Sequence, residues 1–275
     1  MRFSRFCGIL AAIISVSALS VPALAGTGDL LVAPTRIVFD GARGTEVILN
    51  NIGAEPATYR ISLELRRMTT EGVLDDVEVS AANEIEAKTL AMISYAPRRI
   101  VLVPNQPQAI RIGLRAPAGL PDGEYRAHML FRAIPDSKPV TAPADAQAGL
   151  SISLTPIYGV TIPVIVRQGS LKAIAGMSGA KLERSEDGSG ALVVQLSRSG
   201  TRSTFGRIRV YKQGQGKPLF EAAGIAIYPE VTDRKVRFDL PPELMAALAG
   251  PVTIQYVEDP ENGGKTLAEL QTVLR

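Results

Sequence analysis

Apolar and polar side chains alternate with a period of two along most of the chain, which is typical of β-strands with two different faces. The longest alternating stretch is Ser151 to Arg167, SISLTPIYGVTIPVIVR. Its apolar positions are Ile152, Leu154, Tyr158, Val160, Ile162, Val164 and Val166. At roughly 3.3 Å per residue, one strand of this length would extend about 55 Å, about three times the usual length. A small domain rarely covers so long an apolar row, so we expect part of it to serve a partner molecule.

Shorter strand-like runs fill the rest of the chain, separated by turn signals such as Asp40-Gly41 and Pro121-Asp122-Gly123. Before the long stretch they are 31–39, 46–50, 58–66, 100–103, 109–114 and 126–133, and after it 191–196, 207–211, 224–228, 235–240, 252–257 and 267–274. Helical composition is weak at 81–90 and short at 241–248. The spacing predicts an all-β protein whose first half is an immunoglobulin-like sandwich, followed by a second β unit from residue 169. The Pro- and Ala-rich segment 135–149 is interpreted as a mobile loop.

The first 25 residues have the composition of a secretory signal peptide. Arg2 and Arg5 give a positive start, the segment from Cys7 to Val21 is mostly apolar, and Ala23-Leu24-Ala25 is an A-x-A cleavage signal. We therefore expect cleavage after Ala25 and export. The single cysteine of the sequence would leave with the leader, so the mature chain would be stabilised by its apolar core without disulfides.

Charge and aromatic content argue against nucleic acids, anionic membranes and sugars as partners. Loss of Arg2 and Arg5 lowers the formal net charge from +3 to near +1. A nearly neutral chain has no electrostatic footprint for nucleic acid or an anionic membrane. The absence of Trp disfavours stacking platforms for bases or sugars.

The sequence contains no recognisable catalytic constellation. His128 is the only histidine, and its place in the alternating run 126–133 predicts a strand residue satisfied by its neighbours. One histidine and no remaining thiol make a metal site improbable. No nucleophile elbow, zinc-protease helix or phosphate-binding loop is present. We expect no enzymatic activity, no metal and no cofactor.

Several strings, in order and at matching spacing over residues 30–168, resemble the periplasmic pilus-assembly chaperones of the chaperone–usher pathway, the PapD-like family. They are Pro34 to Gly41 (PTRIVFDG), Leu49 to Asn51 with Ala57 to Ile61, Tyr95 to Arg99 with Val103 to Gln106, Leu120 to Arg126 (LPDGEYR), and Arg132 to Pro135 (RAIP). The second half matches only faintly. Tyr59 to Met68 (YRISLELRRM) is most similar to the archaic branch of the family.

The resemblance implies two immunoglobulin-like sandwiches in an L-shaped arrangement, with domains at 26–168 and 169–275. It also implies a mechanism, because a pilus subunit lacks the last strand of its own sandwich and the chaperone supplies one by β-augmentation. The donor strand would be 151–167, with Ile152, Leu154 and Tyr158 at the donor positions. The alternative is that these side chains face the chain's own core. Pro156 cannot donate a ladder hydrogen bond, which favours an edge strand.

The resemblance also assigns charged residues. Arg36 matches the first of two cations that bind the C-terminal carboxylate of the subunit, which a guanidinium can hold bidentately. The second is a lysine in well-known members, but Pro163 occupies its place here. Arg126 is the candidate substitute, since it lies two residues after Glu124 and so on the same strand face. A surface salt bridge is the alternative for both arginines.

Glu124, Arg167 and Asp259 match an ion-pair network between the two domains of the family. Pilus subunits and an outer-membrane usher are the implied partners, in the periplasm, and the free chaperone could pair with a second copy through its own edge. Two other functions stay open, a generic exported adhesion or binding module and a periplasmic enzyme or carbohydrate binder. The adhesion module would have no open donor edge and no dependence on Arg36.

Overall fold

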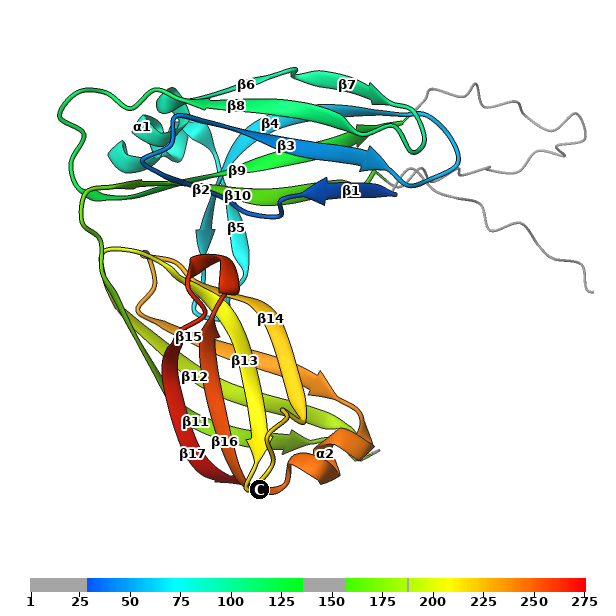
Figure 1. Cartoon of the computed structure of the whole chain (residues 1–275), viewed down its shortest axis with the longest axis vertical. Helices are drawn as coiled ribbons and strands as arrows, with labels where there is room; N and C mark the ends of the chain where they lie inside the picture. Colours follow the sequence, from blue (N-terminus) through cyan, green and yellow to red (C-terminus); the bar gives the residue numbers. More distant parts are fainter. Residues whose placement is uncertain (1–28, 136–156, 187) are drawn as a thin grey trace, which may run out of the picture.

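The computed structural model describes residues 29–135, 157–186 and 188–275, which form two β-sandwiches that meet at a bend (Figure 1). The predicted all-β architecture of two sandwiches in an L-shaped arrangement is confirmed. Three predictions concern residues outside this description. They are the leader, the mobile loop 135–149 except for its first residue, and the donor residues Ile152 and Leu154. None of the described helices is both long and apolar enough to span a bilayer.

The first sandwich is built from two sheets. One sheet has the strand order β1 (Leu30–Ala33), β3 (Gly44–Asn51), β8 (Gln108–Leu114) and β6 (Ile93–Ala96). The other has the order β2 (Ile37–Asp40), β10 (Gly159–Gln168), β9 (Gly123–Ile134), β4 (Ala57–Met68) and β5 (Leu74–Val77), with β7 (Arg99–Leu102) also paired to β4. Short helices η1 (Val79–Ala81) and α1 (Glu84–Met92) follow β5.

Alternate side chains of these strands fill the space between the two sheets. Tyr59, Leu102, Ile110 and Phe131 are at most 2% exposed and belong to one apolar cluster. The run 31–39, predicted as one strand, is divided between the two sheets as β1 and β2. The division falls at Pro34, whose missing N–H and fixed φ are poorly suited to an unbroken ladder.

The second sandwich packs two more sheets against each other. One contains β11 (Ala173–Arg184), β12 (Gly190–Gly200) and β15 (Asp233–Leu240), and the other has the order β14 (Phe220–Ile227), β13 (Thr204–Lys212), β16 (Gly250–Glu258) and β17 (Thr266–Leu274). Helix α2 (Pro242–Leu248) precedes β16 and η2 (Pro260–Asn262) follows it. Strand β11 was not predicted because its sequence, AIAGMSGAKLER, contains mainly small residues and little apolar alternation.

Strand β10 is paired along its whole length on one side and along less than half of it on the other. It runs antiparallel to β9 from Gly159 to Gln168, but parallel to β2 only from Val164 to Arg167. In the described part of the chain no strand pairs with the second edge of Gly159–Pro163. The described part of the predicted strand 151–167 therefore starts with one edge unpaired, the edge that faces away from β9.

The β4–β5 hairpin extends from the first sandwich to the second (Figure 1). Met68 and Leu74 pack into the apolar cluster of the second sandwich. At the hairpin tip the Lys235 N–H donates to the Thr70 carbonyl at 2.8 Å. The relative orientation of the sandwiches is thus fixed by a second contact besides the covalent connection after Gln168, and no pattern in the sequence predicted this contact.

We expect Met68→Ala to weaken this contact. Met68 is 7% exposed, and truncation of a buried Met costs about 2–5 kcal/mol of unfolding free energy. Urea denaturation would measure that loss, and small-angle scattering would detect a wider distribution of angles between the sandwiches. Ile85→Ala, at an exposed position of α1, is the control. Equal stability and scattering of the two variants would contradict the bracing role of the hairpin.

Candidate functional site: the cleft and the open edge of β10

Arg36 lies in the cleft between the sandwiches, just before β2 begins at Ile37. Its guanidinium carbon is 4.4 Å from the ring centroid of Phe205 and 5.7 Å from that of Tyr228, both in the second sandwich. Its terminal nitrogens donate to the Tyr228 hydroxyl at 3.4 Å and to the Ser203 hydroxyl at 3.3 Å. Its Nε is buried without a hydrogen-bond partner. No ion pair joins Arg36 to a carboxylate among the described residues, so its charge is available to a ligand.

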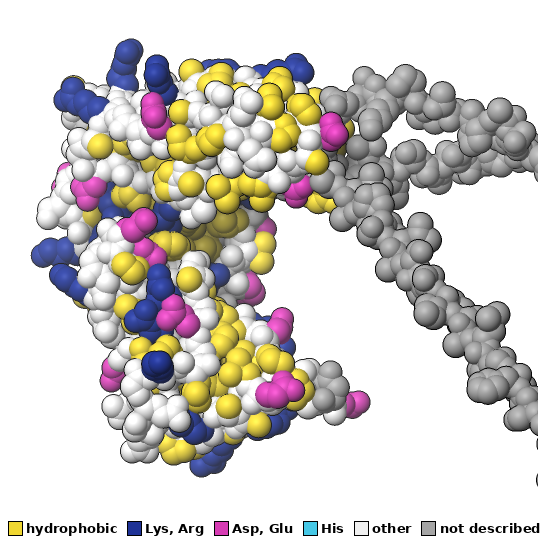
Figure 2. Space-filling view, turned by 45° about the vertical axis from the view of Figure 1, so that its right-hand side comes forward, with side chains coloured by type: hydrophobic (Ala, Val, Ile, Leu, Met, Phe, Trp, Pro, Cys, Tyr) yellow, Lys and Arg dark blue, Asp and Glu magenta, His cyan; other side chains and the backbone are white. Residues whose placement is uncertain are grey.

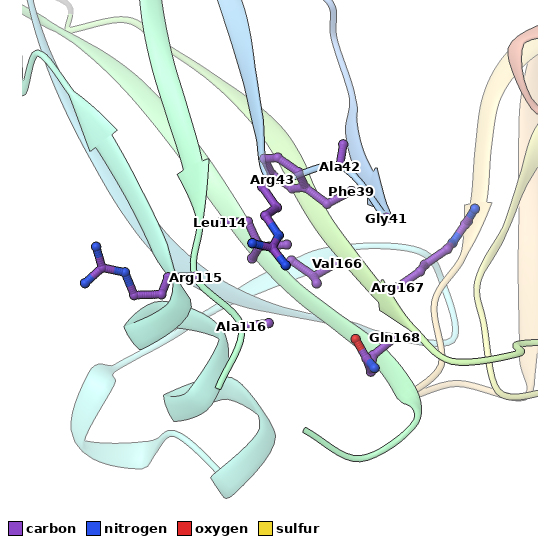
Figure 3. A pocket seen from close by; sticks show the side chains of 10 residues that line it. All are labelled: Phe39, Gly41, Ala42, Arg43, Leu114, Arg115, Ala116, Val166, Arg167 and Gln168. Atoms are coloured by element: carbon purple, nitrogen blue, oxygen red, sulfur yellow. The ribbon is translucent and has the colours of Figure 1, made fainter. Parts of the chain in front are cut away.

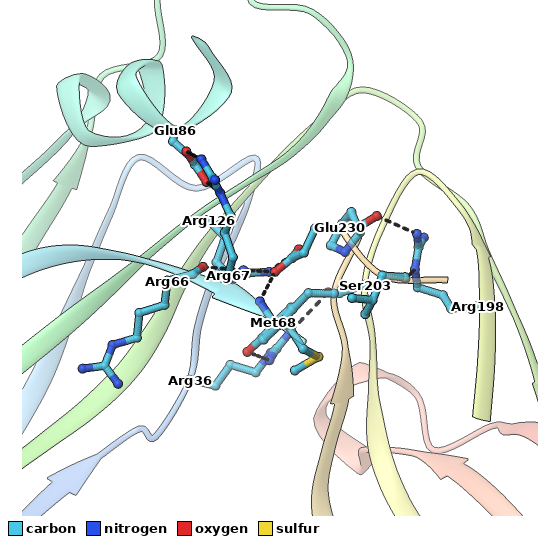
Figure 4. Close-up of polar contacts among 12 residues, drawn as sticks. Arg36, Arg66, Arg67, Met68, Glu86, Arg126, Arg198, Ser203 and Glu230 are labelled. Carbon is cyan, nitrogen blue, oxygen red and sulfur yellow. Dashed lines mark hydrogen bonds and ion pairs between the residues drawn. The ribbon is translucent and has the colours of Figure 1, made fainter. Parts of the chain in front are cut away.

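Arg126 points into the same cleft but already has a carboxylate partner. Its side chain is 8% exposed and forms a bidentate ion pair with Glu230 of the second sandwich, in which Nη1 lies 3.1 Å from Oε2 (Figure 4). Nη2 also donates to the Arg66 carbonyl at 2.9 Å. Its guanidinium carbon lies 3.6 Å from the ring centroid of Tyr228, so Tyr228 contacts both Arg36 and Arg126.

Glu230 links the strand, the hairpin and the second sandwich. One carboxylate oxygen accepts the Met68 N–H at 2.8 Å in addition to the Arg126 pair. Burial raises the pKa of Glu230, but the Arg126 guanidinium and the Met68 N–H outweigh burial and hold that pKa below its ordinary value. Glu230 is therefore an anion at neutral pH.

Buried Arg198 shapes the loops that carry these groups. Its guanidinium donates to backbone carbonyls on two segments of the second sandwich, namely those of Gly200 and Arg202 at 2.9 and 3.1 Å, and of Pro229 at 3.0 Å. The carbonyls of Arg202 and Pro229 immediately precede Ser203 and Glu230 in the sequence. The arginine thus holds both cleft residues in place, and Figure 4 shows it near Ser203 and Glu230.

The predicted ion network is found in part. Arg167 Nε lies 3.2 Å from Glu124 Oε2, and the Glu124 side chain is fully buried. The same oxygen accepts the Ser203 N–H at 3.1 Å and its hydroxyl at 2.9 Å, which ties the first sandwich to the second. Asp259 is instead ion-paired with Arg207 at 3.4 Å and accepts the Glu261 N–H at the start of η2. Because Asp259 follows β16 directly, its carboxylate contacts η2 and Arg207 of β13. Ser203, and not Asp259, is the residue of the second sandwich that binds Glu124.

His128 is buried in β9 beside the cleft arginines, at 1% exposure. Its strand position was predicted, but neither ring nitrogen has a hydrogen-bond partner among the described residues, so the expected satisfaction by neighbours is not found. Burial, and then the positive charges of Arg126, Arg66 and Arg36, lower the pKa of His128 to about 3. Burial is the larger cause of this shift, and the three arginines add to it.

Tyr158 is the one predicted donor residue within the described chain. It is 51% exposed, as is neighbouring Ile157 at 49%, and its carbonyl accepts the Ala133 N–H at 2.9 Å. Further along β10, Val160, Ile162, Val164 and Val166 pack against the core of the first sandwich. These four positions face the core, whereas Tyr158, one of the residues for which a core-facing position was the alternative, is half exposed.

Exposed apolar side chains also occur near this end of the first sandwich. Ile52 follows β3 and Val103 follows β7, and Asn51 and Pro104 form a bridge that brings the two segments together. Ile52 is 57% and Val103 42% exposed. In Figure 2, hydrophobic side chains gather on the first sandwich toward the residues drawn in grey. These exposed apolar side chains could pack against an apolar surface of a partner.

A pocket of about 460 Å³ opens at the end of the first sandwich. Phe39, Leu114 and Val166 form its apolar lining, and Arg43, Arg115 and Arg167 contribute cations. Figure 3 shows that Arg43 turns into the pocket, whereas Arg115 and Arg167 extend away from it in opposite directions. The cations do not converge on one point, so this pocket is a weaker anion site than the cleft. No cluster of three metal-ligating side chains occurs among the described residues.

Comparisons with known proteins give solved structures of similar fold but no match among family models or curated proteins. The YadV chaperone is 14% identical, with a TM-score of 0.47, and covers 89% of this chain and 100% of its own. The CsuC chaperone, in complex with the tip adhesion subunit CsuE of archaic Csu pili from Acinetobacter baumannii, is 13% identical, with a TM-score of 0.46 and coverages of 90% and 99%. The CupB2 chaperone of Pseudomonas aeruginosa is 16% identical, with a TM-score of 0.45 and coverages of 89% and 100%.

Sequence reasoning missed the cleft residues of the second sandwich. Ser203, Phe205, Tyr228 and Glu230 contact Arg36, Arg126 or Glu124. They lie in the half of the chain whose resemblance is faint, and they come from two separate loops and the start of β13. The string Tyr228-Pro229-Glu230 carries no pattern that points to Arg126.

The low pKa of His128 predicts a loss of stability in mild acid. Because the unfolded state takes up a proton near pH 6.5 and the folded state only near pH 3, the contribution of neutral His128 is full above pH 6.5 and declines as the pH falls toward 3. Between pH 7 and 5.5 we expect a loss of about 1 kcal/mol. Urea denaturation at both pH values would show it, and His128→Leu, which does not titrate, should reduce it. An unchanged pH dependence in the variant would contradict the shift.

Proposed function

We propose that this chain is an exported chaperone for pilus subunits, which completes an incomplete subunit sandwich with the edge of β10 and binds the subunit's C-terminal carboxylate at Arg36. The observation that carries the proposal is the position of Arg36 at the point where the open edge ends and the pairing with β2 starts. Ile37 is paired with Val164, so Arg36 lies opposite Pro163, the last residue of the unpaired edge.

This register sets the direction of the bound strand. A partner strand on Gly159–Pro163 would occupy the line of β2 before Arg36. For its C-terminus to reach the Arg36 guanidinium, it must run parallel to β10, as β2 does. Its carboxylate would enter between Phe205 and Tyr228, near the Ser203 and Tyr228 hydroxyls.

The hydrogen-bonding groups of β10 fit this arrangement. Tyr158 faces β9 through its carbonyl, so in a strand the odd-numbered residues direct their backbone groups to the opposite edge. Thr161 then offers an N–H there, while Pro163 lacks an N–H at a position beside Arg36. Ile152, Leu154 and Tyr158 would fill the apolar groove of the subunit, which extends the donor row beyond the described strand. An adhesion module without an open edge does not account for this geometry.

The remaining partners follow from the same proposal. Subunits would be captured in the periplasm after cleavage at Ala25 and passed to an outer-membrane usher. A free molecule could cover its edge by pairing with a second copy. Arg126, the candidate for the second cation, could bind the carboxylate only in place of Glu230. No catalytic step, metal or cofactor is part of this function, because β-augmentation and a carboxylate contact supply the binding free energy.

The carboxylate contact can be tested with a synthetic peptide. We would use alternating Val and Thr residues after two N-terminal lysines, with either a free C-terminal carboxylate or an amide. The mature protein is expected to bind the carboxylate form about fivefold more tightly, as for one partly exposed charge contact of about 1 kcal/mol, measured by fluorescence anisotropy. In Arg36→Gln the difference should vanish.

Arg43→Gln is the matched control, because Arg43 is an exposed arginine of the same sandwich outside the cleft. This control should retain the preference for the free carboxylate. A preference that survives in Arg36→Gln, or is absent from the wild-type protein, would overturn the assignment of Arg36.

The edge itself can be tested by removing one donor. Thr161→Pro deletes an N–H that faces away from β9, so we expect the fold to be retained and peptide binding to fall about tenfold or more, since a proline blocks the ladder of an added strand. Ile162→Pro would instead remove a donor facing β9 and should unfold the sandwich. Circular dichroism and the same anisotropy assay distinguish the two, and full binding by folded Thr161→Pro would exclude the edge.

A further inference from the structure

The two arginines of the cleft differ in one respect, which is the partner already present. Arg36 has only hydroxyl acceptors, at 3.3 and 3.4 Å, and the Nε of both arginines is buried without a hydrogen-bond partner. Arg126 has both oxygens of Glu230 and the carbonyl of Arg66. Because one guanidinium is neutralised from within the protein, the cleft offers a single uncompensated charge rather than two.

The position of Glu230 resembles that of an incoming carboxylate. It reaches Arg126 from the second sandwich with two oxygens against two guanidinium nitrogens, the geometry that a bound carboxylate would adopt. Its side chain is 28% exposed, whereas that of Arg126 is 8% exposed. Water can therefore solvate Glu230 when another anion displaces it, and Glu230 competes for Arg126 without closing the site.

We propose that Glu230 is a specificity-determining residue of the carboxylate site, an internal carboxylate that competes for Arg126 and directs an external carboxylate to Arg36. This inference rests on the proposed function and deepens it, because it makes the site selective for one monoanionic terminus. A ligand that used both arginines would first have to displace Glu230 from its ion pair and from the Met68 N–H.

Two roles of Glu230 must be separated in a test. Its contact with the Met68 N–H supports the hairpin, while its charge neutralises Arg126. Glu230→Gln keeps a carbonyl oxygen that can accept the Met68 N–H and removes the charge. Glu243→Gln is the matched control, since Glu243 is an exposed acid on α2 outside the cleft.

The experiment is a titration of ¹⁵N-labelled mature protein with sodium acetate, against sodium chloride at equal ionic strength. The Nε–Hε signals of Arg36 and Arg126 would be assigned from Arg36→Lys and Arg126→Lys. In the wild-type protein we expect the Arg36 signal to move at lower acetate concentration than the Arg126 signal. In Glu230→Gln the Arg126 signal should respond at about fivefold lower concentration than in the wild type, the effect of one partly exposed charge pair. Glu243→Gln should behave as the wild type.

The outcomes separate the inference from the function on which it rests. Parallel movement of both signals in the wild-type protein would overturn the role of Glu230, and this comparison needs no variant to fold. An unchanged Arg126 response in folded Glu230→Gln would overturn it as well, with Arg36 still responding as the proposed function requires. If acetate moves neither signal in the wild-type protein or in Glu230→Gln, the carboxylate site itself is absent, and the inference fails with it.

Discussion

The early end of the β2–β10 pairing is the constraint on which the rest of this structure depends. Strand β10 completes the core of the first sandwich with its apolar face and is held along one side by β9. Because β2 begins only at Ile37, the opposite edge of Gly159–Pro163 has no partner in the described chain. Unpaired strand edges can pair with other strands, and the proposed function assigns this edge to a partner strand without disturbing the core.

The cleft adds direction to that edge. Arg36 lies where the edge meets β2, and Tyr228 and Phe205 hold its guanidinium from the second sandwich. Arg36 has no carboxylate partner among the described residues, so its positive charge is uncompensated. In the proposed function, Arg36 would favour one orientation of a strand that ends in a carboxylate, whereas the edge alone would accept either.

Three groups of contacts keep the two sandwiches in a defined arrangement around the cleft. The Met68 side chain packs in the second core, the Arg126–Glu230 pair crosses the cleft, and Glu124 bonds to both Arg167 and Ser203. Each contact combines apolar burial or charge with backbone hydrogen bonds, so loss of one weakens its neighbours. The site and the bend are parts of one network.

The sequence by itself determined the strands and much of the site. Alternation with a period of two placed β9 and β10, put His128 in a strand, and set Glu124 and Arg126 on one face, because side-chain direction in a strand is fixed locally. The tertiary structure alone decided which charges meet. Arg126 and Glu230 are 104 residues apart, Asp259 turned to Arg207 rather than Arg167, and the β4–β5 hairpin docked on the second sandwich. Local periodicity carries no information on such pairings, because they depend on how two separately folded cores are oriented.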